Sequence, residues 1–206
     1  MAHTTSFFPT LIHHAPLMRE GVNALNRELL KEIEQLRALD RAGQAWSKTG
    51  YVGGYTSYGS MDRLHQFSST FMALEKKIDA HVRRYAKALH WDLRGGRLVM
   101  TDCWANVMPK GCAHSFHLHP QSVISGTYYV KTPKGCSGLK FEDPRLSSLM
   151  AAPMRGPTAP REMQPFITVP AEAGKVILFE SWLRHEVPAS TIAQERVSIS
   201  FNYHLL

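Results

Sequence analysis

The stretch HSFHLHPQS, residues 114–122, holds three of the eleven histidines of the chain within six positions. His117 and His119 are spaced i, i+2. Side chains alternate along a β-strand, so on a strand these two imidazoles would point to one face and could share a metal ion. Neutral imidazole suits Fe, Zn, Cu and Ni. The pair alone is a weak signal, because it lacks a carboxylate partner and a third ligand must come from elsewhere.

The sequence around this stretch changes character at about residue 97. Apolar residues at three- and four-residue spacing predict amphipathic helices over 19–42 and 69–92, with a loop rich in Gly, Ser and Thr at 46–62. The later segments are short, β-branched and aromatic, and they are separated by Gly and Pro; they cover 97–108, 122–132, 137–143, 165–180 and 196–206. Helices followed by many short strands favour an α+β fold, in which N-terminal helices buttress an antiparallel sandwich or barrel.

Length and composition fit one globular domain. The chain has 206 residues, of which 44% are hydrophobic and 20% charged, and we expect a mainly helical part at 1–96 followed by a core at 97–206. No apolar run approaches the ~20 residues of a membrane span. Three cysteines without a CxxC spacing favour a reducing cytoplasm, and the first 17 residues do not resemble a signal peptide.

The net charge of +7 would suit an anionic partner. The basic residues are scattered along the chain, however, so nucleic acid is a less favoured partner than a small-molecule or peptide substrate. No membrane partner is expected. The helices of the first half leave a homodimer open.

Two later residues complete the pattern that begins at His117. His185 follows the apolar segment GKVILF, and two close ligands with one remote ligand are the usual layout of a metal site with open positions. Eleven positions later, Arg196 begins a segment in which Arg196, Ser198 and Ser200 alternate with apolar residues. An arginine and hydroxyls facing a cavity would bind a carboxylate. Facing solvent, the same alternation would be ordinary.

In this order the motifs HxH, SGTYYV (125–130), SGLKFEDPR (137–145), AGKVILFESWLRHEVP (173–188) and RVSISFNY (196–203) resemble the Fe(II)/2-oxoglutarate-dependent dioxygenases. The likeness covers roughly residues 97–206. It is closest to a group of small bacterial oxygenases and more distant to prolyl hydroxylases. The resemblance implies a double-stranded β-helix core (a cupin-like jelly roll), with Fe(II) and 2-oxoglutarate as cofactors.

Residue by residue, the resemblance implies metal ligands at His117, His119 and His185. Arg196 and Ser198 fall on the motif that binds the distal carboxylate of 2-oxoglutarate, and Tyr129 matches a tyrosine that contacts the same carboxylate in prolyl hydroxylases. We name no catalytic residue beyond the metal ligands.

His119 departs from the family pattern, because it occupies the place of the usual aspartate or glutamate. Three-histidine iron sites occur in other cupin-like dioxygenases, and the bacterial group carries HxHP, so we interpret His119 as a ligand. The other interpretations are a water in place of the carboxylate, or another native metal. Asp102 lies far upstream and Glu186 is next to His185, so neither is a good replacement.

Several further polar and aromatic residues are open between a site role and a structural one. His114 is expected at the pocket rim or on the surface; Asn106, Asn202, Trp104, Trp182 and Arg145 could line the pocket or serve the fold. The loops 47–66 and 143–164 are expected to carry substrate specificity.

The predicted function is a 2-oxoglutarate-dependent hydroxylase, which couples oxidative decarboxylation of 2-oxoglutarate to oxidation of a substrate C–H bond. The alternative is a cupin-like metal-binding protein without oxygenase turnover: a lyase, an isomerase or a sensor of small carboxylates.

Overall fold

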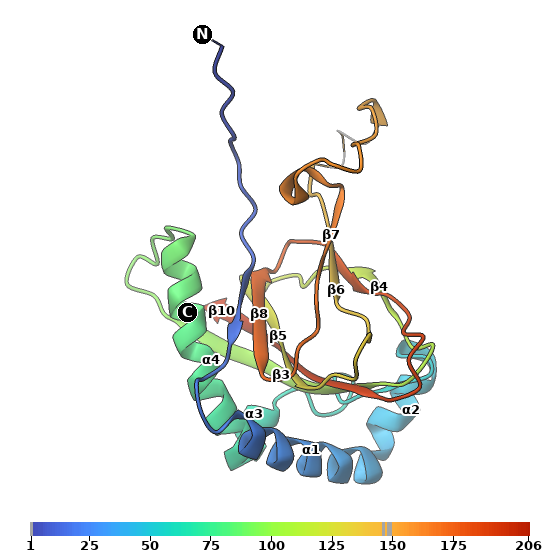
Figure 1. Cartoon of the computed structure of the whole chain (residues 1–206). Coiled ribbons are helices and arrows are strands. Elements are labelled where there is room, and N and C mark those ends of the chain that lie inside the picture. Colours follow the sequence, from blue (N-terminus) through green and yellow to red (C-terminus); the bar gives the residue numbers. More distant parts are fainter. Residues whose placement is uncertain (1, 146, 148–149) are drawn as a thin grey trace.

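Two antiparallel sheets packed face to face form the core of the protein (Figure 1). The computed structural model describes residues 2–145, 147 and 150–206. The large sheet has the strand order β1(His13–Pro16), β8(Lys175–Glu180), β5(Ile124–Lys131), β10(Arg196–Leu205), β3(Leu98–Met108) and β2(Tyr55–Thr56). The small sheet has the order β4(His114–His117), β9(His185–Val187), β6(Leu139–Glu142) and β7(Phe166–Val169).

The helices cover the outer face of the large sheet, as Figure 1 shows for α1 and α4. They are α1(Val22–Leu39), α2(Arg41–Gly50), α3(Leu64–Phe67) and α4(Ser69–Ala88), with a 3₁₀ turn η2(Arg161–Met163) in the later half. Leu29 of α1 and Leu74 of α4 are fully buried against the sheet, together with Ile199 of β10. Burial of an apolar side chain of this size contributes about 1.5–3 kcal/mol. The buried apolar faces of α1 and α4 therefore hold these helices on the sheet.

A second apolar cluster lies between the two sheets. Phe179 and Ile177 from β8 meet Phe141 and Leu139 from β6, and all four are at most 5% exposed. This cluster holds the sheets together on one side of a cavity that is also lined by polar residues, among them Asn106, His117 and Arg196.

The architecture confirms the predicted α+β fold with a jelly-roll core and N-terminal helices. The strands predicted at 97–108, 122–132 and 196–206 are β3, β5 and β10 with their ends moved by at most two residues, and the segment 165–180 contains both β7 and β8. The strong period-2 and period-3.6 patterns therefore predicted element type well.

One expectation about the first half is wrong. The loop expected at 46–62 begins as helix, because α2 runs to Gly50. Asp40 separates α2 from α1: its carboxylate accepts a hydrogen bond from the backbone N–H of Gly43 at 2.8 Å and caps the new helix. The first half also supplies both edge strands of the large sheet, β1 and β2, which are too short to give a sequence pattern.

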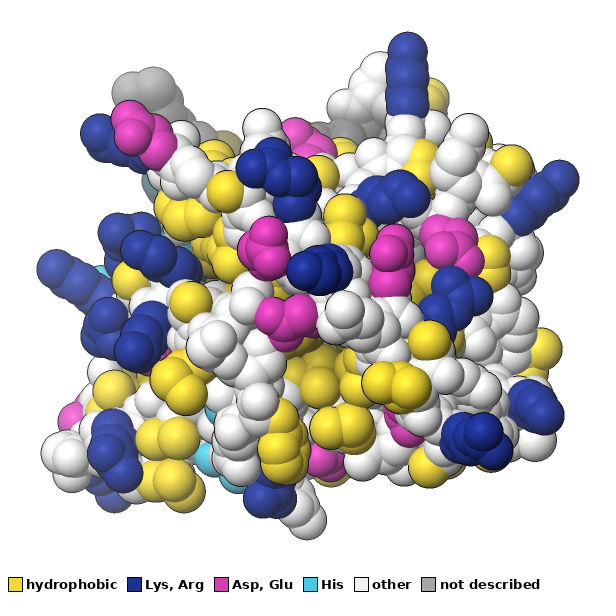
Figure 2. Space-filling model, turned by 90° about the horizontal axis from the view of Figure 1, so that it is seen from below, with side chains coloured by type: hydrophobic (Ala, Val, Ile, Leu, Met, Phe, Trp, Pro, Cys, Tyr) yellow, Lys and Arg dark blue, Asp and Glu magenta, His cyan; other side chains and the backbone are white. Residues whose placement is uncertain are grey.

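Figure 2 shows basic side chains spread over one face, with acidic and hydrophobic side chains between them. Cys103, Cys112 and Cys136 are all free thiols. None of the helices in the described part combines the length and the apolar character that a membrane crossing requires.

Asp40 generates a prediction about stability. Besides capping α2, its carboxylate accepts hydrogen bonds from the hydroxyls of Tyr55 (2.8 Å) and Ser60 (2.6 Å), so it ties α2 to β2 and the following loop. We expect Asp40→Ala to lower the free energy of unfolding by about 2 kcal/mol, because a cap and charge-assisted bonds are lost together. Urea unfolding measures this.

Two variants serve as controls in the same experiment. Asp40→Asn keeps a capping side chain and should lose less stability than Asp40→Ala. Glu34→Ala changes an exposed carboxylate on α1 and should have little effect. An unfolding free energy of Asp40→Ala within ~0.5 kcal/mol of the unaltered protein would contradict this role.

Candidate metal centre and adjoining cavity

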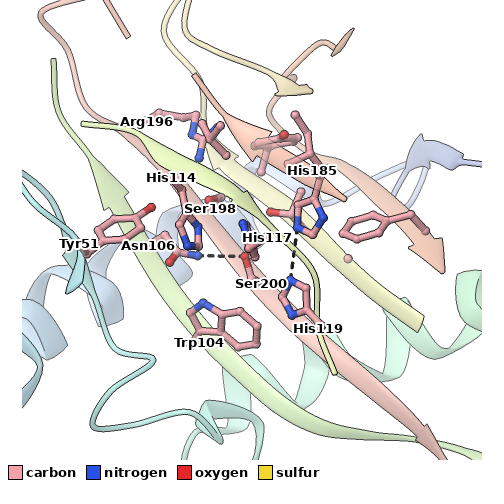
Figure 3. Close-up of a pocket in the computed structure, with 16 residues that line it drawn as sticks. Tyr51, Trp104, Asn106, His114, His117, His119, His185, Arg196, Ser198 and Ser200 are labelled. Atoms are coloured by element: carbon pink, nitrogen blue, oxygen red, sulfur yellow. Dashed lines mark hydrogen bonds between the residues drawn. The ribbon is translucent and has the colours of Figure 1, made fainter. Parts of the chain in front are cut away.

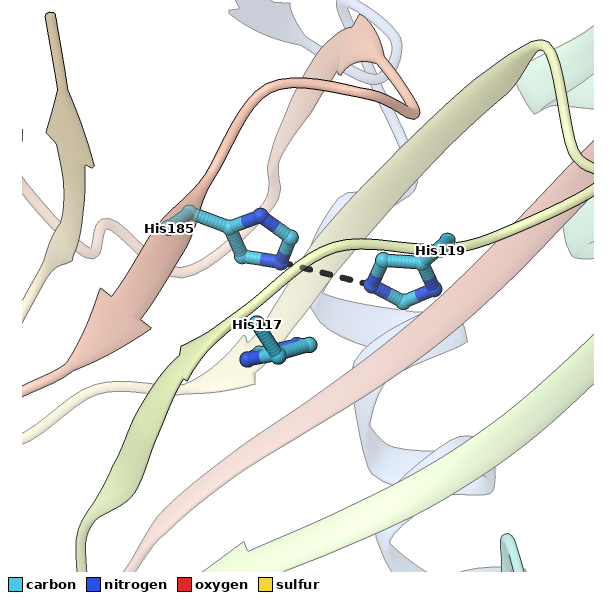
Figure 4. A group of neighbouring side chains, drawn as sticks. All are labelled: His117, His119 and His185. Carbon is cyan, nitrogen blue, oxygen red and sulfur yellow. Dashed lines mark hydrogen bonds between the residues drawn. The ribbon is translucent and has the colours of Figure 1, made fainter. Parts of the chain in front are cut away.

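Three histidines from separate places in the chain converge between the two sheets (Figure 4). His117 is the last residue of β4 and His185 is the first residue of β9, and these two residues are paired across the strands. His119 lies two residues beyond β4 rather than on it, yet its ring still meets that of His117, with centroids 5.2 Å apart. The backbone N–H of His119 donates to Ser181 O at 3.0 Å, which anchors this segment beside β8.

The ring nitrogens of these histidines are close enough to share one ion. One nitrogen from each lies within 4.8 Å of the other two, and Nε2 of His119 and Nε2 of His185 are 3.3 Å apart. Nitrogen ligands at about 2.1 Å from a metal are separated by about 3.0–3.4 Å when they meet at octahedral or tetrahedral angles. The spacing therefore fits a shared divalent transition metal.

Hydrogen bonds on the far side of two rings set their tautomers. Nδ1 of His117 lies 2.8 Å from Ser115 O, and Nδ1 of His185 lies 2.9 Å from Leu183 O. Each carbonyl accepts a hydrogen bond from Nδ1–H, so the ring proton stays on Nδ1 and the Nε2 lone pair is free to bind a metal. This arrangement is usual for metal-binding histidines.

Burial keeps the three imidazoles neutral. It lowers the pKa of His185 to about 2 and that of His119 to about 4, with repulsion from His117 adding to the effect in both cases. The pKa of His117 is also lowered by burial. The neutral ring is the form that binds a metal, so the donor set is in its binding form at physiological pH.

Arg196 lies in the same cavity as a buried cation without an anionic partner (Figure 3). Its side chain belongs to a residue only 4% exposed. One terminal nitrogen donates to Ser137 O at 3.0 Å and the other lies 2.7 Å from Met108 Sδ, while Nε has no hydrogen-bond partner in the described structure. No carboxylate among the described residues forms an ion pair with it. An unpaired buried charge is costly, so this pocket fits a carboxylate ligand.

Ser198 and Tyr129 complete the surroundings of Arg196. In the sheet register Ser198 lies between Asn106 of β3 and Tyr129 of β5, and all line the cavity. The Tyr129 hydroxyl is buried and unpaired, and the Arg196 guanidinium lies 5.6 Å from the centre of its ring. Burial raises the pKa of Tyr129 to about 12, so the hydroxyl remains a hydrogen-bond donor.

The structure therefore brings together all six residues that the sequence selected: His117, His119, His185, Arg196, Ser198 and Tyr129 line one cavity. The roles that the sequence predicted for them stay predictions, since geometry alone shows only that they meet.

His114, which was expected at the pocket rim or on the surface, lines the cavity. Its ring stacks on His117 with centroids 3.9 Å apart, and it meets the edge of Tyr51 at 5.5 Å. A register irregularity in β4 between His114 and His117 accounts for this position, because it turns both rings to the cavity in spite of the three-residue spacing. Burial, with further repulsion from the neighbouring histidines, lowers the pKa of His114 to about 3.

The remaining open assignments divide between site and fold. Trp104 forms a wall of the cavity, and Asn106 both lines it and donates to Ser200 Oγ at 3.0 Å. Asn202 accepts from Ser125 Oγ at 2.8 Å and serves the sheet. Trp182 is 48% exposed and lies outside this cavity, and Arg145 pairs with Asp143 at 2.9 Å on the surface.

Neither carboxylate that was considered as a replacement ligand joins the histidines. Among the described residues the group of close metal-binding side chains contains His117, His119 and His185 alone. Glu186 faces away and binds Lys140 Nζ at 2.7 Å, as the alternation predicts. Asp102 lies behind Asn202, whose amide donates to it at 3.4 Å.

Sequence reasoning missed four aromatic residues of the site. Phe179 packs on His185 with ring centroids 4.5 Å apart, and Tyr51, Trp46 and Tyr58 line the outer part of the cavity. The last three fall in or beside the predicted specificity loop 47–66, where aromatic residues alternate with glycines. From the other predicted loop, 143–164, no described residue lines the cavity; residues 146, 148 and 149 lie outside the described part.

Comparison with known proteins agrees with this geometry. Residues 102–202 match a family described as "Putative 2OG-Fe(II) oxygenase". This segment runs from β3 to β10 and contains all six residues selected from the sequence. No curated protein matches the sequence.

Solved structures share the fold at low sequence identity. The epimerase SnoN from nogalamycin biosynthesis, described as non-heme and alpha-ketoglutarate dependent, has a TM-score of 0.66 at 18% identity, with 95% of this chain and 79% of that chain covered. A prolyl-4-hydroxylase from Pseudomonas putida has a TM-score of 0.57 at 16% identity, with 95% and 92% covered.

HygX from Streptomyces hygroscopicus, crystallised with nickel and 2-oxoglutarate, has a TM-score of 0.63 at 13% identity, with 95% of this chain and 83% of that chain covered. The likeness to these three proteins concerns the fold. The family match covers the segment that carries the site, residues 102–202, and places this segment in the 2-oxoglutarate–Fe(II) oxygenase superfamily.

Proposed function

We propose that this protein is a Fe(II)- and 2-oxoglutarate-dependent dioxygenase that oxidises a C–H bond of its substrate. One observation carries the proposal: a buried arginine without an anionic partner lies in the same cavity as three neutral imidazoles whose nitrogens converge. A metal ion and a small dicarboxylate would satisfy both features at once.

Fe(II) and 2-oxoglutarate, the predicted cofactors, are those of the superfamily. In this chain His117, His119 and His185 would hold the metal. When bound, iron and 2-oxoglutarate supply the oxidising chemistry: O2 oxidises a substrate C–H bond while 2-oxoglutarate is decarboxylated to succinate. The protein itself contributes binding, orientation and exclusion of water.

With three neutral histidine ligands, the protein supplies no negative charge to the metal. Because His119 stands in place of an anionic ligand, three imidazoles leave the full +2 charge of the metal uncompensated. The carboxylates of 2-oxoglutarate are then the only anions in the cavity, and they would balance the metal and Arg196 together. We infer that metal and 2-oxoglutarate binding support each other strongly in this protein.

Arg196, Ser198 and Tyr129 would hold the far carboxylate. The unpaired Arg196 Nε and Tyr129 hydroxyl are both buried donors, and each gains a partner when a carboxylate enters. Both lie on central strands of the large sheet, β10 and β5, so they are positioned before any ligand binds. Preorganisation of this kind lowers the cost of binding.

The competing function is a metal-binding protein without oxygenase turnover. Oxygen uptake and succinate formation distinguish the two: with Fe(II) present, an oxygenase consumes O2 and forms succinate when 2-oxoglutarate is added, even slowly and without the true substrate. Oxygen uptake that does not depend on 2-oxoglutarate would refute the proposal. SnoN, which shares the fold, is described as an epimerase. That this chain hydroxylates its substrate, rather than epimerising it, is therefore a separate part of the proposal.

The metal ligands generate a prediction. His185→Ala should abolish stoichiometric iron binding, and His119→Ala should weaken it by at least ten-fold, because each removes one of three donors to the ion. Equilibrium dialysis followed by metal analysis measures both. His3→Ala, an exposed histidine near the N-terminus, is the matched control.

Each outcome of this experiment has a separate meaning. Retained one-to-one iron in His185→Ala would remove His185 from the site. Unchanged affinity in His119→Ala would mean that a water occupies the position of the family's carboxylate. His119→Asp should bind iron, since it restores the usual ligand of the family.

Arg196 generates a second prediction, which separates binding from folding. Arg196→Met should weaken 2-oxoglutarate binding by about 10- to 100-fold with metal retained, because charge-assisted bonds contribute about 1.5–3 kcal/mol. The same variant should not lower the unfolding free energy of the cofactor-free protein, since it removes a buried unpaired charge. Calorimetric titration and urea unfolding measure the two quantities.

Arg145→Ala is the control for this pair of measurements, because Arg145 forms a surface ion pair away from the cavity. If Arg196→Met left 2-oxoglutarate affinity unchanged, Arg196 would have no part in binding. If it strongly destabilised the cofactor-free protein, the guanidinium would be structural.

A further inference from the structure

An aromatic chamber opens from the metal centre to the surface. It has a volume of about 190 Å³ and is bounded by His117 and His119 at its inner end. We call Trp46, Tyr58 and Trp104 its aromatic wall. The inner cavity of Figure 3, which contains Arg196, shares Trp104, His117 and His119 with this chamber. The two spaces meet at the proposed metal ligands.

The aromatic wall forms a continuous path to His119. The ring centroids of Trp46 and Tyr58 are 6.0 Å apart, those of Tyr58 and Trp104 are 5.0 Å apart, and Trp104 stacks on His119 at 6.0 Å. Trp46 is 39% exposed and Tyr58 is 49% exposed, whereas Trp104 is 6% exposed. The wall therefore leads from solvent to the point where a substrate C–H bond would react.

Two glycines hold the outer end of this wall in place. A side chain at Gly50 would lie 2.7 Å from the Trp46 ring, and one at Gly59 would lie 2.4 Å from it. These contacts are too short for a Cβ atom. The indole therefore packs directly on the backbone of α2 and of the following loop, which fixes its orientation in the absence of ligand.

The chamber is lined by aromatic, aliphatic and uncharged polar side chains together with histidines. No Lys, Arg, Asp or Glu among the described residues lines it. The polar groups at its floor are largely paired with each other: Thr56 Oγ1 donates to Asn106 Oδ1 at 2.9 Å, and Asn106 Nδ2 donates to Ser200 Oγ. A cation that entered would find no carboxylate among the described lining residues, and an anion would find no Lys or Arg.

The energies favour a neutral ligand over an ion. A cation would gain about 0.5–2 kcal/mol from an aromatic face, but it would lose several kcal/mol of hydration without a carboxylate to replace it. An anion would be repelled by the aromatic faces and would find no basic side chain in this chamber. An uncharged ring gains from stacking and burial without either cost.

We propose that the chamber binds one uncharged ring of the substrate, stacked along Tyr58 and Trp104, with the rest of the substrate passing Trp46 into solvent. The size agrees with a single ring, since a cavity of about 150 Å³ accepts benzene. This inference rests on the proposed function, because it takes the metal end of the chamber as the place of reaction.

A series of three compounds of equal shape tests the charge argument: benzamide, benzamidinium and benzoate. They are titrated into protein that carries Zn(II) and saturating 2-oxoglutarate. Zn(II) replaces iron and prevents oxidation, and 2-oxoglutarate occupies Arg196. The indole N–H signals of Trp46 and Trp104, assigned with Trp46→Phe and Trp104→Phe, report binding by nuclear magnetic resonance. We expect benzamide to shift these two signals with an affinity at least ten-fold higher than that of either ion.

The aromatic wall is tested with variants at its half-exposed member. Tyr58→Ala should weaken benzamide binding about five-fold, and Tyr58→Phe should restore it, because the ring rather than the hydroxyl forms the wall. Trp182→Ala is the control, since Trp182 lies outside the chamber and is 48% exposed.

Three results would overturn the inference: equal or tighter binding of a charged compound at Trp104, benzamide shifts confined to the other tryptophans, or no shift at millimolar benzamide. The titration is repeated without metal and 2-oxoglutarate. If both forms prefer benzamide but no 2-oxoglutarate-dependent oxygen uptake occurs, the proposed oxygenase function is wrong and the inference about the chamber stands. If that oxygen uptake occurs but benzamide is not preferred, the proposed function stands and the inference about the chamber is wrong.

Discussion

The alternation of side chains along β10 is the constraint on which the rest of the structure depends. This strand lies between β5 and β3 at the centre of the large sheet. Val197, Ile199 and Phe201 are at most 4% exposed and pack with the helices, so the neighbouring positions must face the other way. Arg196 and Ser198 are thereby directed into the space between the sheets. A slip of one residue would exchange the two faces and remove both the core and the site.

The small sheet completes the site by bringing two strand ends to the same place. Pairing of β4 with β9 sets His117 opposite His185, and the chain beyond β4 returns His119 to them. The result is a cavity that holds a buried cation and three neutral donors but no acid among the described ligands. Burial and repulsion from His117 lower the pKa of His119; a side-chain hydrogen bond with Asn202 and, to a smaller extent, the charge of Asp102 oppose this. The anion that the cavity lacks is what a dicarboxylate cosubstrate would supply.

The sequence could predict the features that local residue patterns determine, but not those that contacts between distant parts of the chain determine. The period-2 segments predicted β3, β5 and β10, and the motif order around His117, His185 and Arg196 selected residues that meet in space. Features set by tertiary contacts were missed: the two-residue strand β2 and the start of α2 directly after Asp40. For His114 the sequence left the pocket rim and the surface open, and an irregular strand pairing turns it to the cavity. Trp104 was left open as a residue that could line the pocket, whereas Trp46 and Tyr58 were missed because they meet it only through the fold.

The most direct test of the account is anaerobic addition of Fe(II) and 2-oxoglutarate to the purified protein, followed by visible absorption spectroscopy. Direct chelation of the metal by 2-oxoglutarate gives a charge-transfer band that neither component gives alone. The account predicts this band at one equivalent of each, and its loss in His185→Ala. Stoichiometric iron and 2-oxoglutarate binding without the band would contradict the claim that the histidines and Arg196 serve one shared complex.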